Sequence, residues 1–425
     1  MARRFMCGLN SISMLKIRFL IILVLMGNNI ARGQFSMNEF LSDARNDVRL
    51  YENKIKSEFL EEKRYRSPIL HRVEFRARTN DFNITQDDFR LRFNPTNPAE
   101  IRANKKYYSL ERNSLIIDYQ YALNKAIFKR YHQIISFFQL SDEIVYKKKE
   151  IILQQDQLTI LEAALGNSDF DITEYIKEKE NLLNLSLELN DLFHNKDKIE
   201  HEIKSTFAFS GNIESNTNSQ FISYEQIKNM VELKSVISDT VNNIHIENLN
   251  RQITLDEQRI VIEKAEGRRN IGYIQAEYDR FRGDDFDNHF GVQVGVRIPL
   301  TNADKPDLNR RKLNVMEDKA DVVREKTALD VQCELLKLDL EFLFSQNRLI
   351  TGEISNDNLL ILLNQNQNIK PEDLLEAQKS ILKMKKYEKL IQWDIYKSFI
   401  DYLYYSGKLI DVPLKNYLSE NLEEI

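Results

Sequence analysis

The sequence predicts a mainly α-helical protein in which long helices alternate with short β-hairpins and the whole arrangement occurs twice. Three observations support this fold class. Only 12 glycines and 7 prolines occur in 425 residues, so the chain lacks the turn residues that a fold with many βα connections needs. Apolar residues recur every 3.5 residues over long stretches, which is typical of helices that pack side by side. Two short regions instead alternate apolar and charged residues, which indicates strands.

The composition excludes several classes of protein. Sixty Lys and Arg against 65 Asp and Glu leave a net charge of −5, too near neutral to suggest nucleic-acid binding. Two cysteines exclude a disulfide scaffold and a multi-cysteine zinc site. The chain has no HExxH, Gly-rich phosphate loop or GxSxG, and His194 and His201 alone are a weak case for a metal. We therefore expect no enzyme activity, no cofactor and no metal site.

The N-terminus resembles a secretory signal peptide. Lys16 and Arg18 precede an apolar run over residues 19–26, and the small residues Ala31 and Gly33 suit a cleavage site. Residues 1–33 are therefore predicted to be removed. A membrane anchor is the alternative, although the apolar run is too short to span ~30 Å of hydrocarbon.

The next segments predict two long helices. No proline occurs between Pro98 and Pro299, and a proline inside a helix costs ~3 kcal/mol. One helix can run from Pro98 to about Leu165, which is roughly 100 Å at 1.5 Å per residue. A polar turn then leads to a second helix, whose apolar residues follow one heptad frame: Leu182, Leu185, Leu189, Leu192, Ile199 and Ile203.

Two regions predict antiparallel strand pairs. The first covers residues of about 71–82 and 87–93, where Val73 and Phe75 alternate with arginines, and it ends at Pro95. The second covers about 270–280 and 289–298, where Val292 and Val294 alternate with glycine and polar residues, and it ends at Pro299. Each pair therefore has one apolar and one polar face.

The spacing predicts two structural repeats. We expect a first repeat at 34–209 with a helix–helix turn near 166–174, a linker at 210–223, a second repeat at 224–407 with a turn near 366–376, and a tail at 408–425. The helix that follows the second strand pair can run from Pro306 to about Asn364.

An apolar sheet face must be covered, and two readings remain open. In a soluble protein another layer would cover it. In an outer membrane the apolar face would meet lipid, while the charged face would line a watery lumen. Open strand edges in hydrocarbon cost several kcal/mol for each unpaired group, so four strands would need further copies to close, and three copies would supply twelve strands.

Several segments resemble TolC-type outer-membrane efflux proteins, the outer membrane factors. They are the opening FSMNEF, the strand FGVQVGVRIPL, and the turns GNSDFDITEYIKEKENL and NIKPEDLLEAQKSI. The resemblance implies a homotrimer with a 12-stranded outer-membrane β-barrel that continues into a periplasmic α-helical barrel. It also implies a passive exit duct, gated at its periplasmic helical tip, for a tripartite efflux or type I secretion system. The duct would dock to a periplasmic adaptor protein and an inner-membrane transporter.

The resemblance also implies site residues at the periplasmic end. The aperture would be formed by Thr173, Glu174, Asp373 and Glu376, where like carboxylates meet near the symmetry axis. An ordinary helix N-terminus also favours such acids, and the two readings are compatible. Adaptor docking is expected at the turns, with Gly166, Asn167, Asn368 and Pro371.

The charged strand faces suggest a basic lumen that favours anionic cargo on exit. The arginines concerned are Arg72, Arg76, Arg78, Arg90, Arg92 and Arg297. Partial pairing with Glu74 and Asp88 is the alternative. For the whole protein, the alternative function is a periplasmic coiled-coil structural or adaptor-like protein with a small soluble β domain.

Overall fold

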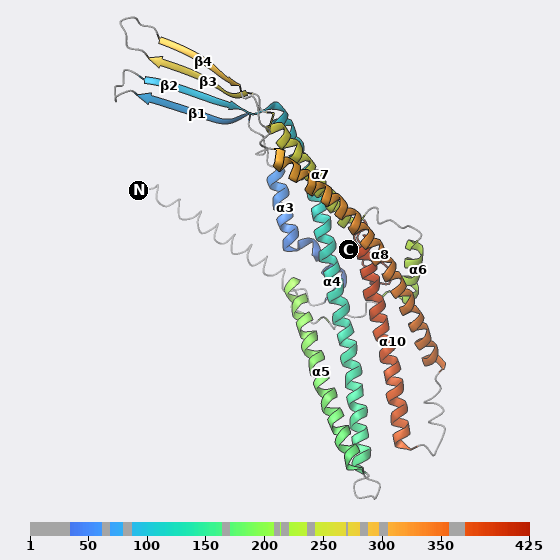
Figure 1. Cartoon of the computed structure of the whole chain (residues 1–425). Helices are drawn as coiled ribbons and strands as arrows, with labels where there is room; N and C mark the ends of the chain where they lie inside the picture. The colour runs from blue at the N-terminus through green and yellow to red at the C-terminus, as the bar shows by residue number, and fades with distance from the viewer. Residues whose placement is uncertain are drawn as a thin grey trace, which may run out of the picture. The chain divides into compact units, whose positions relative to one another are not determined.

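The computed structural model describes residues 35–61, 69–79, 87–163, 171–207, 213, 221–235, 243–268, 271–280, 288–296, 305–356 and 370–425 (Figure 1). The predicted signal peptide, residues 1–33, lies outside the described residues. The chain forms two compact units. Unit 1 comprises residues up to Asp47, Asn124–Ser238 and Gln332–Ile425, and unit 2 comprises Val48–Leu123 and Asp239–Val331.

Helices dominate the described chain, as the low proline and glycine content predicts. The longest is α4, Pro98–Ala163, which begins at a proline and contains no other. The bounds of the remaining helices are α2 Met37–Ser42, η1 Asp43–Asn46, α3 Val48–Glu61, α5 Ile172–Thr206, α6 Tyr224–Ser235, α7 Ile244–Glu266, α8 Lys305–Asn356 and α10 Pro371–Tyr405.

Four strands in unit 2 form one antiparallel sheet. They are β1 Leu70–Thr79, β2 Asp87–Pro95, β3 Ile271–Arg280 and β4 Asn288–Val296, in the order β1-β2-β3-β4. The central β2–β3 pairing joins the two hairpins, although they lie about 180 residues apart in the sequence. The strands β1 and β4 are therefore the edges of the sheet within this chain.

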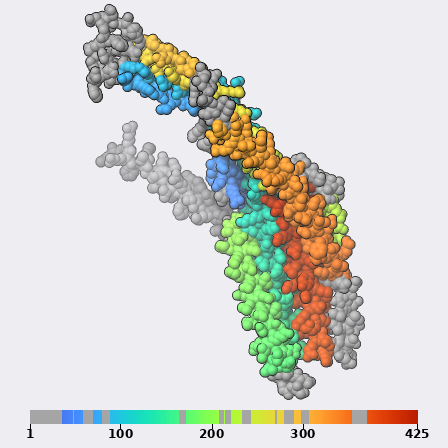
Figure 2. Space-filling view, in the orientation of Figure 1, coloured from blue at the N-terminus to red at the C-terminus, as the bar shows by residue number. Residues whose placement is uncertain are grey.

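The long helices of unit 1 lie side by side in the order α5, α4, α10 (Figures 1 and 2). Lys147 of α4 pairs with Glu188 of α5 at 2.7 Å, and the Trp393 indole of α10 donates to Asp142 of α4 at 2.8 Å. Residues 332–356 of α8 flank α10 on its other side (Figure 2). The four long helices thus form a single layer, with α5 and α8 at its two edges, and the shorter helix α6 contacts α10.

The N- and C-terminal segments close one end of unit 1. The Tyr131 hydroxyl of α4 donates to the Lys415 carbonyl and accepts from the Tyr417 amide, and its ring is fully buried. Burial raises the pKa of Tyr131 far above its ordinary value. Arg130, equally enclosed, donates to the Phe40 carbonyl, so α2 and the tail pack on the same stretch of α4.

In unit 2, helix α7 contacts both α4 and α8. Gln258 of α7 donates to the Ala103 carbonyl of α4 at 2.9 Å, and Lys319 of α8 pairs with Glu257 of α7 at 2.6 Å. A small apolar core, Ile253, Ile260 and Val315, joins α7 to α8. Unit 2 therefore places α7 between α4 and α8.

Candidate functional site

The sheet has one face that is apolar throughout its three middle rows. The register places Phe75, Leu91, Ala276 and Val292 in one row across all four strands. The two residues of this row on the edge strands β1 and β4 are exposed: Phe75 is 66% and Val292 is 65% exposed. The twelve residues of this apolar face are Val73, Phe75, Ala77, Phe89, Leu91, Phe93, Ile274, Ala276, Tyr278, Phe290, Val292 and Val294.

The opposite face carries the predicted arginines in an ordered network. Arg72 and Arg76 of β1 share the Glu74 carboxylate, each at 3.0 Å. Arg90 of β2 pairs with Asp88 at 2.7 Å and with Glu277 of β3 at 2.6 Å. Pairing with Glu74 and Asp88, the alternative that the sequence left open, is thus present.

The network also links the two hairpins. Arg92 donates to Gln275 at 3.0 Å and stacks on the Tyr273 ring, with its guanidinium carbon 4.2 Å from the ring centroid. The Tyr273 ring lies over Gly295 of β4, where a Cβ atom would overlap it. Only glycine leaves room for this stacked pair.

Sequence reasoning missed Glu277 as a partner of Arg90. The alternation of residues 270–280 places Glu277 on the polar face of its strand, but only the strand order shows that this strand lies beside β2. Arg78 lies on the same face, next to Asp88 in register. Arg297, also predicted to line the lumen, is outside the described residues.

The predicted aperture residues lie at the N-termini of α5 and α10. Thr173 and Glu174 form the first turn of α5, where the Asp171 carboxylate accepts from both amides at 2.8 and 3.3 Å. Asp373 lies in the first turn of α10 and Glu376 follows, paired with Lys379 at 3.3 Å. Among the described residues, no hydrogen bond or ion pair joins the two helix beginnings.

The predicted docking residues are only partly described. Pro371 is the first residue of α10, which matches the preference of proline for that position. Gly166, Asn167 and Asn368 lie outside the described residues.

The two edge helices of unit 1 carry exposed apolar seams, which we call the α5 seam and the α8 seam. The α5 seam is distinct from the predicted heptad, whose residues are at least half-buried and face α4. Both seams repeat at intervals of three, four or seven residues, as in coiled coils. The α5 seam consists of Ile172, Ile176, Leu183 and Leu187, and the α8 seam of Leu335, Leu338, Phe342 and Leu349.

A charge ladder crosses the layer of unit 1. Lys147 bridges Glu188 and Glu150, and Lys386 of α10 reaches Glu150 at 2.8 Å. Burial opposes ionisation of both central groups, but the hydrogen bonds outweigh it: the pKa of Lys147 is raised, and the pKa of Glu150 is lowered from its ordinary 4.5. Three neighbouring helices are thus linked by four charges.

Among the described residues, no three His, Cys, Asp or Glu side chains are placed to hold a metal ion. No helix there has both the length and the apolar content needed to cross a membrane.

Comparisons by sequence give no match, either to a family model or to a curated protein. Comparisons by structure match nearly the whole chain. The outer membrane protein VceC of Vibrio cholerae has a TM-score of 0.62 at 10% identity, over 87% of this chain and 96% of that one. The MtrE outer membrane channel of Neisseria gonorrhoeae has a TM-score of 0.60 at 10% identity, over 88% of this chain and 89% of that one.

A third relative in structure is the CmeC outer membrane channel of Campylobacter jejuni, with a TM-score of 0.55 at 11% identity, over 91% of this chain and 84% of that one. The chain has the outer-membrane channel fold. The predicted mainly α-helical fold with antiparallel strands and the resemblance to TolC-type proteins are confirmed at the level of the fold, whereas the trimeric barrel stays a prediction. These three solved structures are described as an outer membrane protein and two outer membrane channels.

Proposed function

We propose that this chain is one subunit of a homotrimeric outer-membrane channel. The channel would serve as the passive exit duct of a tripartite efflux or type I secretion system, leading from the periplasm to the outside. Its partners would be a periplasmic adaptor protein and an inner-membrane transporter.

The apolar face of the sheet carries this proposal. Burying a side chain the size of Val or Phe is worth about 1.5–3 kcal/mol, and all of the twelve positions except Ala77 and Ala276 carry a side chain of at least that size, so leaving them in water would be a large unmet cost. Lipid would cover this face, and the arginine network on the other face would line a watery lumen. The fold agrees, because the similar solved structures are described as outer membrane channels.

The open edges supply the argument for several copies. β1 and β4 each have a neighbouring strand on one side only in the four-stranded sheet. Unpaired backbone groups in hydrocarbon cost several kcal/mol each. A head-to-tail contact between β4 of one copy and β1 of the next is heterologous and closes as a ring. Three copies give a barrel of twelve strands, within the range of known outer-membrane barrels.

The helix edges favour the same closure. The α5 seam of one copy and the α8 seam of the next are both apolar, exposed and repeated at heptad intervals. Since α5 and α8 occupy opposite edges of the layer in unit 1, their contact is also head-to-tail. The strand edges and the helix edges therefore both favour a ring of copies in head-to-tail contact.

We assign the aperture to Thr173, Glu174, Asp373 and Glu376, and the lumen lining to the arginines of the polar sheet face. The paired carboxylates of that face reduce its positive charge, so we expect a weaker preference for anions than the arginines alone would give. Adaptor docking is assigned to the turns between the long helices, with Gly166, Asn167, Asn368 and Pro371.

The α8 seam provides the test of this proposal. Leu335→Glu should dissociate the detergent-purified trimer, because it would bury a carboxylate in an apolar contact. Arg348→Glu adds the same side chain on another side of α8 and should leave the trimer intact. Light scattering on the purified protein measures the mass of the assembly, and cell fractionation shows in which compartment the protein lies.

One outcome would reject the proposal, and another would reject the helix contact within it. A wild-type monomer that stays in solution without detergent would favour the periplasmic adaptor-like alternative. A trimer that tolerates Leu335→Glu as well as Arg348→Glu would reject the seam contact.

A further inference from the structure

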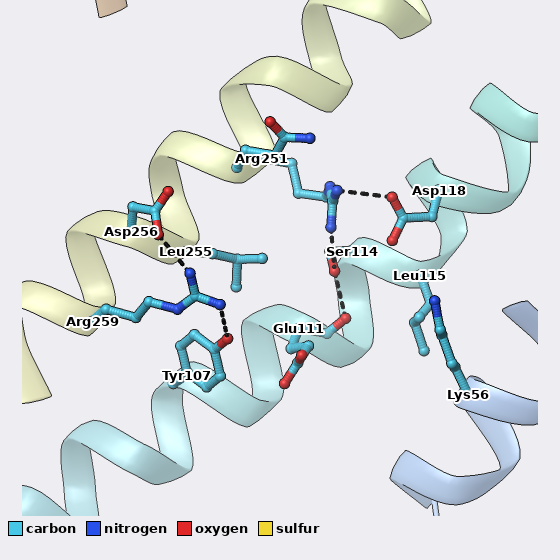
Figure 3. A pocket seen from close by; sticks show the side chains of 11 residues that line it. Lys56, Tyr107, Glu111, Ser114, Leu115, Asp118, Arg251, Leu255, Asp256 and Arg259 are labelled. Carbon is cyan, nitrogen blue, oxygen red and sulfur yellow. Dashed lines mark hydrogen bonds and ion pairs between the residues drawn. The ribbon is translucent and has the colours of Figure 1, made fainter. Parts of the chain in front are cut away.

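A cavity of about 440 Å³ lies in unit 2 between α3, α4 and α7 (Figure 3). Its volume is in the range of small-molecule sites. Nothing in the channel proposal uses it. Its eleven lining residues are Lys56, Tyr107, Glu111, Ser114, Leu115, Asp118, Arg251, Gln252, Leu255, Asp256 and Arg259.

Two arginines of α7 bridge to α4 at the two ends of the cavity. Arg251 pairs with Asp118 at 2.8 Å and donates to Ser114 at 3.2 Å. Arg259 pairs with Asp256 at 2.8 Å and donates to the Tyr107 hydroxyl at 3.0 Å. These contacts hold the walls in place and neutralise both guanidinium groups (Figure 3).

Two opposite charges remain. Glu111 of α4 is half-buried and Lys56 of α3 is exposed. Within the part of the chain that the structure describes, no hydrogen bond or ion pair reaches the Glu111 carboxylate or the Lys56 ammonium. Both groups are therefore open to a ligand that carries the opposite charges.

The apolar and hydroxyl groups of the lining define the rest of the site. Leu255 is buried and Leu115 half-buried, so they offer a surface for a small apolar body. The Tyr107 hydroxyl accepts from Arg259 and retains its own proton for donation. The site thus presents one anion, one cation, one hydroxyl donor and an apolar patch.

We propose that this cavity binds a small zwitterion of amino-acid or dipeptide size. Its ammonium group pairs with Glu111, its carboxylate with Lys56, and its side chain lies on Leu115 and Leu255. A simple anion or cation would satisfy only one of the two free charges and would leave the other unpaired.

Calorimetric titration of the detergent-purified full chain tests this assignment, with the dipeptide glycyl-leucine as the probe. Lys56→Met and Glu111→Gln should each weaken binding at least about tenfold, since each removes one charged hydrogen bond. Lys54→Met and Glu52→Gln, exposed changes on α3, are the matched controls and should bind as the wild type does. N-acetyl-glycyl-leucine amide, which lacks both charges, should not bind.

The charge exchange Lys56→Glu with Glu111→Lys should restore binding that either single exchange abolishes. The assignment is rejected by an absence of saturable binding to the wild type, by equal binding of the uncharged probe, or by wild-type affinity in the Lys56→Met and Glu111→Gln variants. Circular dichroism of each variant shows whether it is folded. Binding does not depend on the sheet meeting lipid, so failure here and failure of the channel proposal are separate results.

Discussion

The substitution Val292→Arg distinguishes a lipid-facing sheet from a water-facing one. Val292 lies in the middle of the three apolar rows, at the edge strand β4. If the apolar face meets lipid, this row lies near the centre of the bilayer, where an arginine costs about 2–4 kcal/mol. That range corresponds to a roughly 30- to 1000-fold change in the folding equilibrium.

Gln293→Arg provides the control on the next residue. Its side chain lies on the polar face and donates to Glu277 at 3.0 Å, a contact that an arginine can replace. We expect a change within about 0.5 kcal/mol, as for ordinary surface substitutions. The comparison isolates the face of the sheet, because strand, depth and new charge are nearly the same.

Equilibrium unfolding by guanidinium in phosphatidylcholine vesicles measures both variants. A Phe290→Trp background places a fluorescent reporter on the apolar face, where its emission reports contact with lipid. Equal stability of Val292→Arg and Gln293→Arg in vesicles would refute the lipid-facing assignment. It would also favour a sheet that water or another protein layer covers.

Two further predictions concern unit 1. Arg130→Met should lower the free energy of unfolding by about 3 kcal/mol, because it removes the ion pair to Asp43 and the donor to the buried Phe40 carbonyl. The exposed change Lys129→Met should have almost no effect in the same thermal melts. Glu150→Gln should flatten the acid side of the stability curve. The lowered pKa of Glu150 gives the wild type a stabilisation that is present above pH 4.5 and is lost as the pH falls through the folded-state pKa. The free energies of unfolding from denaturant melts at about pH 5 and pH 3 should therefore differ less in the variant than in the wild type. Equal acid sensitivity of both proteins would contradict this linkage.

Local patterns sufficed to predict the long helices and the strands. Proline-free stretches and heptad spacing predicted the helices that became α4 and α5, because helix formation depends on residues within one or two turns. The alternation around Val73 and Val292 predicted strands with one apolar face, because side chains on a strand point alternately to its two sides. The signal peptide and the repeat boundaries stay predictions.

Contacts between distant residues had to come from the tertiary structure. The partner of Arg90 across the hairpins is Glu277, and nothing local to either residue indicates the β2–β3 register that joins them. The cavity around Glu111 likewise draws its walls from three separate helices. Periodicity along a chain determines which side chains share a face, whereas the choice of neighbour depends on the packing free energy of the whole fold.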